Sequence, residues 1–294
     1  MDLFIQLVVA GLAAGGIYAS VALALVMIHE ATELINFAQG EMAMFSTYIA
    51  WTLINAGFPY WAAFFLTIGI SFLGGVVIER VVIRPVEHAP ILTLIIVFIG
   101  LLVIFNSLAG WIWTYTIKAF PSPFPEAPLV LSEGVSLRMH DVGAIGVTLV
   151  VLFLLYLFFR FTPLGLAMRA AAQNPISSRL VGIRVGWMLA LGWGLAAAIG
   201  AVAGMMVAPI IFLDPSMMSG VLLYGFASAL LGGINSPGGA VVGGFVVGVL
   251  ENLVGAYLPF IGNELKLTVA LFIIVIVVIF RPGGLFGKVA VSRV

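Results

Sequence analysis

The chain has 294 residues, and it contains no cysteine. It can therefore form no disulfide bond, hold no metal through thiolate ligands and use no cysteine nucleophile. Its three histidines, His29, His88 and His140, lie far apart and lack the HExxH spacing of a helical zinc site. The sequence also lacks a GxSxG motif, which marks the nucleophile of many hydrolases. These absences argue against an enzyme that carries its own metal centre or nucleophile.

Charge is scarce as well. Only 8% of the residues are charged, whereas a soluble domain has about 25%. The 12 basic residues balance the 12 acidic residues, so the chain has no excess of positive charge with which to bind nucleic acid. Hydrophobic residues make up 63% of the chain, in runs long enough to cross a bilayer of about 30 Å. The composition predicts an all-α polytopic membrane protein.

A nucleotide-binding motif is also missing. The segment PGGLFGKV (282–289) superficially resembles a P-loop, but it lacks the first glycine at the required spacing. Val289 also stands where a P-loop has the Ser or Thr that binds magnesium. We therefore expect no cofactor in this chain. If ATP drives the protein, another subunit must bind ATP and Mg²⁺.

Nine apolar stretches alternate with shorter polar segments. They cover residues about 4–28, 38–55, 60–80, 91–111, 141–159, 187–210, 219–234, 238–257 and 266–280. The second, seventh and eighth stretches are short or interrupted by glycine, which is compatible with full spans and with re-entrant or broken helices. The sequence thus predicts about eight to nine transmembrane helices, some of them short or broken.

Basic residues are distributed unequally between the two sides of the predicted membrane. Nine fall on one side: Arg80, Arg84, Arg160, Arg169, Arg179, Arg184, Arg281, Lys288 and Arg293. Only Lys118, Arg138 and Lys266 fall on the other side. Because cytoplasmic loops carry an excess of Lys and Arg, we expect the first side to be cytoplasmic and the C-terminus to be inside.

Glycine is abundant, with 34 residues, and much of it lies inside the apolar stretches. GxxxG pairs occur at 11–15, 200–204, 239–243 and 244–248. In lipid, small residues at this spacing let helix backbones approach closely. The pairs favour tight packing within one subunit over a seam between two subunits.

The segment 164–186 is a soluble-looking island in this apolar chain, and it contains three of the arginines. Thr162-Pro163 is typical of a helix start, with Thr as the cap and Pro at the first helical position. Asn174-Pro175 breaks that helix and can begin another, which Gly182 is placed to end. The pattern predicts a short basic helix that is available to a soluble partner.

Polar side chains at membrane depth are costly, which makes them candidates for a functional site. The candidates for a translocation path are Asn36, Gln39 and Glu41, near one predicted helix start, and the pair Glu251 and Asn252. The first three residues could either line the path or lie in an interfacial loop, and the sequence favours neither role. For the pair, a buried hydrogen-bonded structural role is an equal alternative. The nearby His29, Glu30 and Glu33 are expected in an interfacial loop.

Five segments together resemble one known family. They are INFAQGEM (35–42), ERVVIRPVEHAPILTLIIVFIGL (79–101), LGLAMRAAAQNPISSRLVGI (164–183), LLGGINSPGGAVVGGFVVGVLENL (230–253) and RPGGLFG (281–287). Through them the chain resembles the H-type (LivH-type) permease subunit of bacterial ABC importers for branched-chain amino acids. The segments occur in the family's order and extend over essentially the whole chain.

The resemblance implies one transmembrane permease domain over 1–294, with a cytoplasmic coupling loop at about 161–186 and an external segment at about 112–140. It also implies a second permease subunit, two cytoplasmic ATPase subunits and an external solute-binding protein as partners in the membrane. The ATPases would contact the coupling loop, and the residues that match the family there are Arg169, Gln173, Asn174, Pro175, Ser177, Arg179 and Gly182. The loop has no Glu before Ala170-Ala171, unlike the EAA pattern of other ABC importers.

The implied function is ATP-driven import of branched-chain or related amino acids across the bacterial cytoplasmic membrane by alternating access. Relatives of this architecture also move urea or short amides, and no residue here distinguishes these substrates. The main alternative class is an ion-coupled secondary transporter or a channel, in which Glu41 or Glu251 would bind the ion. That alternative leaves the basic loop unexplained.

Overall fold

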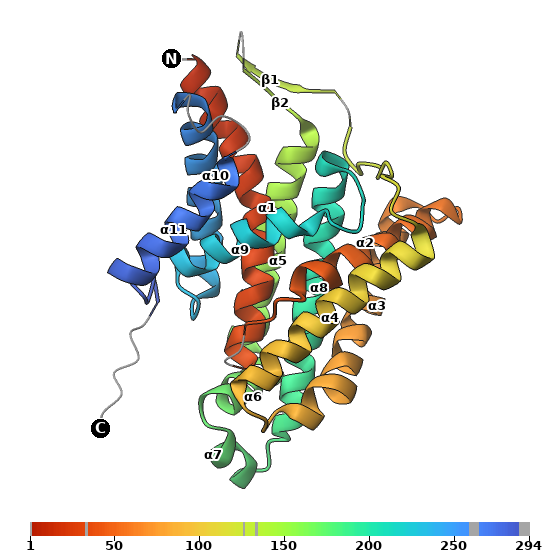
Figure 1. The fold of residues 1–294 in the computed structure, drawn as a ribbon, viewed down its shortest axis with the longest axis vertical. Helices are drawn as coiled ribbons and strands as arrows, with labels where there is room; N and C mark the ends of the chain where they lie inside the picture. Colours follow the sequence, from red (N-terminus) through yellow and green to blue (C-terminus); the bar gives the residue numbers. More distant parts are fainter. Residues whose placement is uncertain (1, 33–34, 126, 133–134, 259–264, 288–294) are drawn as a thin grey trace. The chain divides into compact units, whose positions relative to one another are not determined.

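The structure is a computed structural model that describes residues 2–32, 35–125, 127–132, 135–258 and 265–287. The described residues are almost entirely helical (Figure 1). The α-helices are α1 (Asp2–Thr32), α2 (Gln39–Asn55), α3 (Tyr60–Ile78), α4 (Ile91–Trp113), α5 (Met139–Phe161), α6 (Pro163–Gln173), α7 (Pro175–Leu180), α8 (Val185–Ile211), α9 (Met218–Gly232), α10 (Pro237–Tyr257) and α11 (Lys266–Phe280). Each of the nine predicted apolar stretches corresponds to one of these helices.

The predicted all-α polytopic fold is confirmed. Within the described residues, six helices are long and apolar enough to cross a membrane: α1, α3 with its continuation to Val86, α4, α5, α8 and α10. Helices α9 and α11 are apolar but have only 15 residues each, and α2 has 17. Of the three uncertain stretches, α2 and α9 are indeed short, whereas α10 is one unbroken helix of 21 residues.

Two features differ from the sequence-based expectation. The segment between α4 and α5 contains an antiparallel pair of strands, β1 (Leu129–Ser132) and β2 (Val135–Leu137), with Leu129 opposite Leu137. In addition, α1 extends to Thr32, so His29 and Glu30 lie in its last turns and not in a loop. Glu33, Lys288 and Arg293 lie outside the described residues.

The chain divides into two compact units, and each unit gathers segments that are distant in sequence. Unit 1 comprises Met1–Val26, Ser122–Leu149 and Gly220–Val294, and unit 2 comprises Met27–Pro121 and Val150–Ser219. The chain passes from one unit to the other at four places, and three of these lie inside helices: in α1, in α5 and near the start of α9.

In unit 1, α1 and α10 pack backbone against backbone at their glycines (Figure 1). A Cβ atom placed on Gly11 would lie 2.6 Å from the Cα atom of Val249, and one on Gly15 would lie 2.7 Å from the Cα atom of Phe245. On the facing helix, Gly248 approaches the backbone of Gly11 and Gly15 equally closely. The paired GxxxG motifs therefore pack within the subunit, as the sequence favoured.

In unit 2, α2 and α3 both pack against α8. A Cβ atom on Gly204 of α8 would lie 2.7 Å from the carbonyl oxygen of Ala43 on α2. One turn away, Gly200 faces Gln39 at the start of α2. On another face of α8, Gly194 contacts the backbone of Phe72 on α3. Small residues thus let α8 serve as the central helix of this unit.

Gly15→Ala should destabilise the protein, because the added methyl group would meet backbone atoms of α10 that cannot move aside cheaply. Overpacking of this kind costs about 1–3 kcal/mol. Gly146→Ala is the matched control, since a Cβ atom at Gly146 of α5 meets nothing within 4 Å. Replacement of an open helical glycine should be neutral or stabilising by up to about 1 kcal/mol. Thermal unfolding in mild detergent measures both, and equal midpoints would contradict the packing.

Candidate functional site

The segment between α5 and α8 folds into two short helices that begin with side-chain caps. The hydroxyl group of Thr162 accepts a hydrogen bond of 3.0 Å from the backbone N–H of Gly165, at the start of α6. The side chain of Asn174 accepts one of 2.9 Å from the N–H of Ser177, at the start of α7. Gly182 has a φ of +85° just after α7 ends. The predicted starts and the predicted stop are all confirmed.

All seven residues proposed for the coupling loop are exposed: Arg169, Gln173, Asn174, Pro175, Ser177, Arg179 and Gly182. Three apolar residues on and just after α7 are also exposed, with exposed fractions of 74% for Ile176, 84% for Leu180 and 77% for Val181. The sequence analysis missed these three. Their i, i+4, i+5 spacing around a polar helix could have indicated them. Together the basic and apolar side chains form a surface suited to a protein partner.

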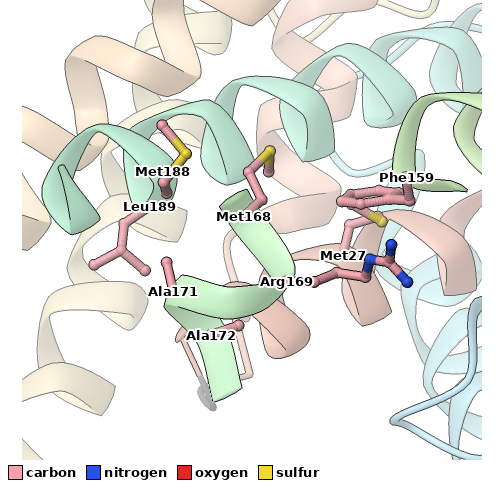
Figure 2. A pocket seen from close by; sticks show the side chains of 8 residues that line it. All are labelled: Met27, Phe159, Met168, Arg169, Ala171, Ala172, Met188 and Leu189. Atoms are coloured by element: carbon pink, nitrogen blue, oxygen red, sulfur yellow. The ribbon is translucent and has the colours of Figure 1, made fainter. Parts of the chain in front are cut away.

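Helix α6 is anchored by its other face. Met168 and Ala171 are buried, and together with Met188 and Leu189 of α8 they line a small pocket (Figure 2). Figure 2 also places Arg169 beside Met27 of α1 at one end of this pocket. α6 is therefore attached to α8 by apolar contacts, while its polar face remains open.

The N-terminus of α8 is held by a cluster that the sequence analysis did not predict. Arg84 makes a bidentate ion pair with Glu79, with nitrogen–oxygen distances of 3.0 to 3.2 Å. The same guanidinium donates to the backbone carbonyl of Gly186. The Cζ atom of Arg80 lies 3.4 Å from the ring centroid of Trp187. No sequence spacing links Arg84 to Gly186 or Arg80 to Trp187, because these partners are about a hundred positions apart.

Just after the opposite end of α8, the chain pairs with one of the basic residues assigned to the other side of the membrane. Lys118 and Leu213 exchange two backbone hydrogen bonds of 2.9 Å each. Because α8 has 27 residues, this bridge lies about 40 Å along the helix from the Glu79–Arg84 pair. Arg80 and Arg84 thus lie at one end of α8 and Lys118 at the other, consistent with the sides assigned from charge.

Two of the path candidates fix the start of α2. The side-chain oxygen of Asn36 accepts a hydrogen bond of 3.0 Å from the N–H of Ala38. The side-chain amide of Gln39 donates a bond of 3.0 Å to the carbonyl oxygen of Ala196 on α8. Both side chains are buried. Their contacts are those of residues that hold α2 in place.

Glu41 differs from its neighbours on α2. It is only 5% exposed, and its Oε2 atom has no hydrogen-bond partner among the described residues. The side chain of Asn106 on α4 lies close to its carboxyl group, and Asp214 adds a second negative charge to its surroundings. The side-chain amide of Asn106 also donates a hydrogen bond of 2.7 Å to the carbonyl oxygen of Pro215, and this bond fixes the orientation of the amide. A buried carboxyl oxygen without a partner is costly unless a ligand or water satisfies it.

The second candidate pair, Glu251 and Asn252, lies on α10 in unit 1. The hydroxyl group of Tyr18 on α1 donates to Oε2 of Glu251 at 2.7 Å, and Tyr224 on α9 lies close to the same carboxyl group. The two tyrosine rings stack with their centroids 4.5 Å apart. The side-chain amide of Asn252 donates to Gly248 within its own helix. Both side chains thus have partners of the kind that a structural role requires.

The fold and this arrangement define a multi-pass helical membrane protein with an exposed basic loop. The sequence profile of the family described as "Branched-chain amino acid transport system / permease component" matches residues 7–279. The chain belongs to this family of transport permeases.

Characterised relatives resemble the chain over nearly its whole length. The high-affinity branched-chain amino acid transport system permease protein LivH of Salmonella typhimurium is 30% identical, and the match covers 99% of this chain and 98% of LivH. The permease protein BraD of Pseudomonas aeruginosa, from a system of the same description, is 31% identical with the same coverage. A chain of the solved structure of PsaBC from Streptococcus pneumoniae in complex with Fab has the same fold, with a TM-score of 0.50 at 13% identity; the match covers 95% of this chain and 92% of that one.

Tyr18→Phe should destabilise unit 1, because it removes one donor from the buried carboxyl group of Glu251. A buried polar group left without its partner costs about 1–3 kcal/mol. A double-mutant cycle with Glu251→Gln, followed by thermal unfolding in detergent, isolates the interaction. If the two substitutions were additive, the Tyr18–Glu251 hydrogen bond would contribute nothing.

Proposed function

We propose that this chain is the membrane-spanning permease subunit of an ATP-driven importer for branched-chain or related amino acids. Family membership and full-length similarity to LivH and BraD support this function. The importer would work by alternating access, in which two states of the permease expose the path to opposite sides of the membrane. Such a change requires a difference in binding free energy between the states, which nucleotide binding to partner subunits would supply.

The observation that carries the proposal is the exposed surface on α6 and α7. It combines two arginines, Arg169 and Arg179, with the apolar side chains of Ile176, Leu180 and Val181. A secondary transporter or a channel has no need of such a surface. An ATPase subunit would bind it and move it, and Gln173, Asn174 and Ser177 offer further polar contacts.

The complete importer would contain this permease, a second permease subunit, two cytoplasmic ATPase subunits and an external solute-binding protein. ATP and Mg²⁺ would bind to the ATPase subunits and not to this chain, which acts as a transport subunit and not as an enzyme. The excess of basic residues on one side supports a bacterial cytoplasmic membrane protein with its C-terminus inside.

Within unit 2 we assign the translocation path to the surroundings of Glu41. The unpartnered carboxyl oxygen of Glu41 and the nearby charge of Asp214 would attract the ammonium group of an amino acid. Asn36 and Gln39 would keep α2 in position, whereas Glu251 and Asn252 would stabilise unit 1.

Arg179→Glu should abolish amino acid uptake without affecting membrane insertion, because it reverses the charge of the surface that the ATPase binds. The measurement is purification of the tagged chain from its native host in mild detergent, followed by mass spectrometry and uptake assays. The unmodified chain should recover an ATPase and a second permease. The variant should recover much less ATPase.

Arg160→Glu is the matched control, since Arg160 is also exposed but lies at the end of α5, outside the coupling loop. It should retain both uptake and the ATPase. Full uptake by the Arg179→Glu variant would reject the loop as the coupling element. An unmodified chain that purifies alone and still transports after reconstitution would reject the importer altogether.

Glu41→Gln should slow transport by roughly tenfold or more, because a hydrogen bond to a charged group contributes about 1.5–3 kcal/mol. Uptake of leucine over a range of concentrations, at equal amounts of protein in the membrane, measures this effect. Glu87→Gln is the matched control, because Glu87 lies outside α2 and pairs with the exposed side chain of His88. Unchanged kinetics in the Glu41 variant would assign Glu41 a structural role.

A further inference from the structure

A network of charged and aromatic side chains links the end of α3 to the beginning of α8. Its members are Glu79, Arg80 and Arg84 after α3, and Gly186 and Trp187 in the first turn of α8. We call these five residues the α3–α8 clamp. Gly186 and Trp187 follow α7 by only a few residues, so the clamp lies directly beside the coupling loop in the chain.

The ion pair of the clamp is well suited to fix a geometry. Glu79 is only 2% exposed, and an isolated buried carboxylate is strongly unfavourable. The planar guanidinium of Arg84 satisfies both carboxyl oxygens and also binds the carbonyl of Gly186. A bidentate contact of this kind fixes direction as well as distance. Displacement of α8 from the end of α3 would therefore break the hydrogen bond from Arg84 to Gly186 and the contact of Arg80 with Trp187.

The backbone of this segment is itself unusual. α3 continues as a π-helical segment, Glu79–Ile83, and then as a 3-10 turn, Arg84–Val86. π-helical segments are rare and are often found at functional sites. Here the change of helical pitch places Glu79 and Arg84, five residues apart, in direct contact. In a regular α-helix, neighbours on one face are three or four residues apart.

Farther from the clamp, within the two helices, α3 and α8 also pack closely against each other. A Cβ atom on Gly194 of α8 would lie 2.9 Å from the carbonyl oxygen of Phe72, and Gly75 of α3 faces the backbone of Trp193 equally closely. Packing this tight resists sliding, because there is no free volume between the helices. The clamp thus attaches the first turn of α8 to a helix with which α8 already packs.

We propose that Glu79, Arg80 and Arg84 are positioning residues for coupling: through the clamp they make α3 move together with α8 when a partner displaces the coupling loop. The inference rests on the proposed function. Without the clamp, a push on α7 would bend the first turn of α8 away from the end of α3, and the displacement would not reach the part of α8 that packs against α3. ATP would then be hydrolysed without a matching opening of the path.

The test is the number of leucine molecules transported per ATP hydrolysed, measured with the complete purified importer in liposomes and its binding protein. Coupling free energies of about 1–3 kcal/mol correspond to factors of about 5 to 150. Glu79→Gln should therefore lower this ratio by about fivefold or more. A merely structural defect would reduce the amount of active complex and so lower transport and hydrolysis together, leaving the ratio unchanged.

A second variant covers the case in which Glu79→Gln does not assemble. Trp187→Leu removes the ring beneath Arg80 at a position that is partly exposed, and it should also lower the ratio. The matched controls are Asp141→Asn for the carboxylate, since Asp141 is a buried carboxylate paired with Arg138 outside the clamp, and Trp111→Leu for the tryptophan, since Trp111 is exposed on α4. Both controls should keep the ratio of the unmodified importer.

Unchanged ratios in the clamp variants that assemble would overturn the inference and leave the proposed function intact. Failure of the unmodified importer to couple leucine uptake to ATP hydrolysis would instead overturn the proposed function, and the inference with it. A lowered ratio in the clamp variants, with unchanged ratios in both controls, would establish the role of the clamp.

Discussion

Close approach of helix backbones at glycine holds each unit of this protein together. Between helices in lipid there is little hydrophobic driving force, because the lipid tails are as apolar as the side chains. Stability must then come from contact area and from polar bonds, and both require short distances. The pairs α1 with α10 and α2 with α8 achieve this at Gly11, Gly15, Gly200 and Gly204. The polar bonds of the interior depend on this proximity, since Tyr18 reaches Glu251 and Gln39 reaches Ala196 only across such narrow interfaces.

Within the described residues, the buried polar side chains fall into two kinds. Gln39 and Glu251 each bind a partner on another helix, and Glu79 binds Arg84 on its own segment. Each of these bonds stabilises the packing seen in the structure. The carboxyl group of Glu41 lies close to Asn106, but one of its oxygens has no hydrogen-bond partner in the described part of the chain. No contact within the described fold compensates for the free-energy cost of burying this oxygen. A bound ligand is the usual explanation for such a position.

The sequence allowed us to predict the features that depend on residues close together in the chain: the helices, their caps and their ends. The nine apolar stretches became helices because hydrophobic length alone decides their existence in a membrane. The caps at Thr162 and Asn174 and the stop at Gly182 were predictable because each involves residues three or four positions apart. The contacts of Arg84 with Gly186 and of Tyr18 with Glu251 were not predictable, because they depend on which helices meet. The strand pair after Leu129 also escaped notice, since a few residues give no reliable period.

The coupling loop is held by local contacts, which stabilise its short helices, and by long-range contacts, which attach it to the rest of unit 2. A helix of six residues such as α7 is too short to be stable alone, so its caps and the proline at its start must hold it. The loop must also transmit a displacement and not absorb it. Burial of Met168 against α8 stiffens one side of the loop, and the contact of Arg84 with Gly186 stiffens the other. A partner that moves the exposed face between these two anchors would therefore move α8 itself, and with it the helix that carries Ala196 against Gln39 and the start of α2.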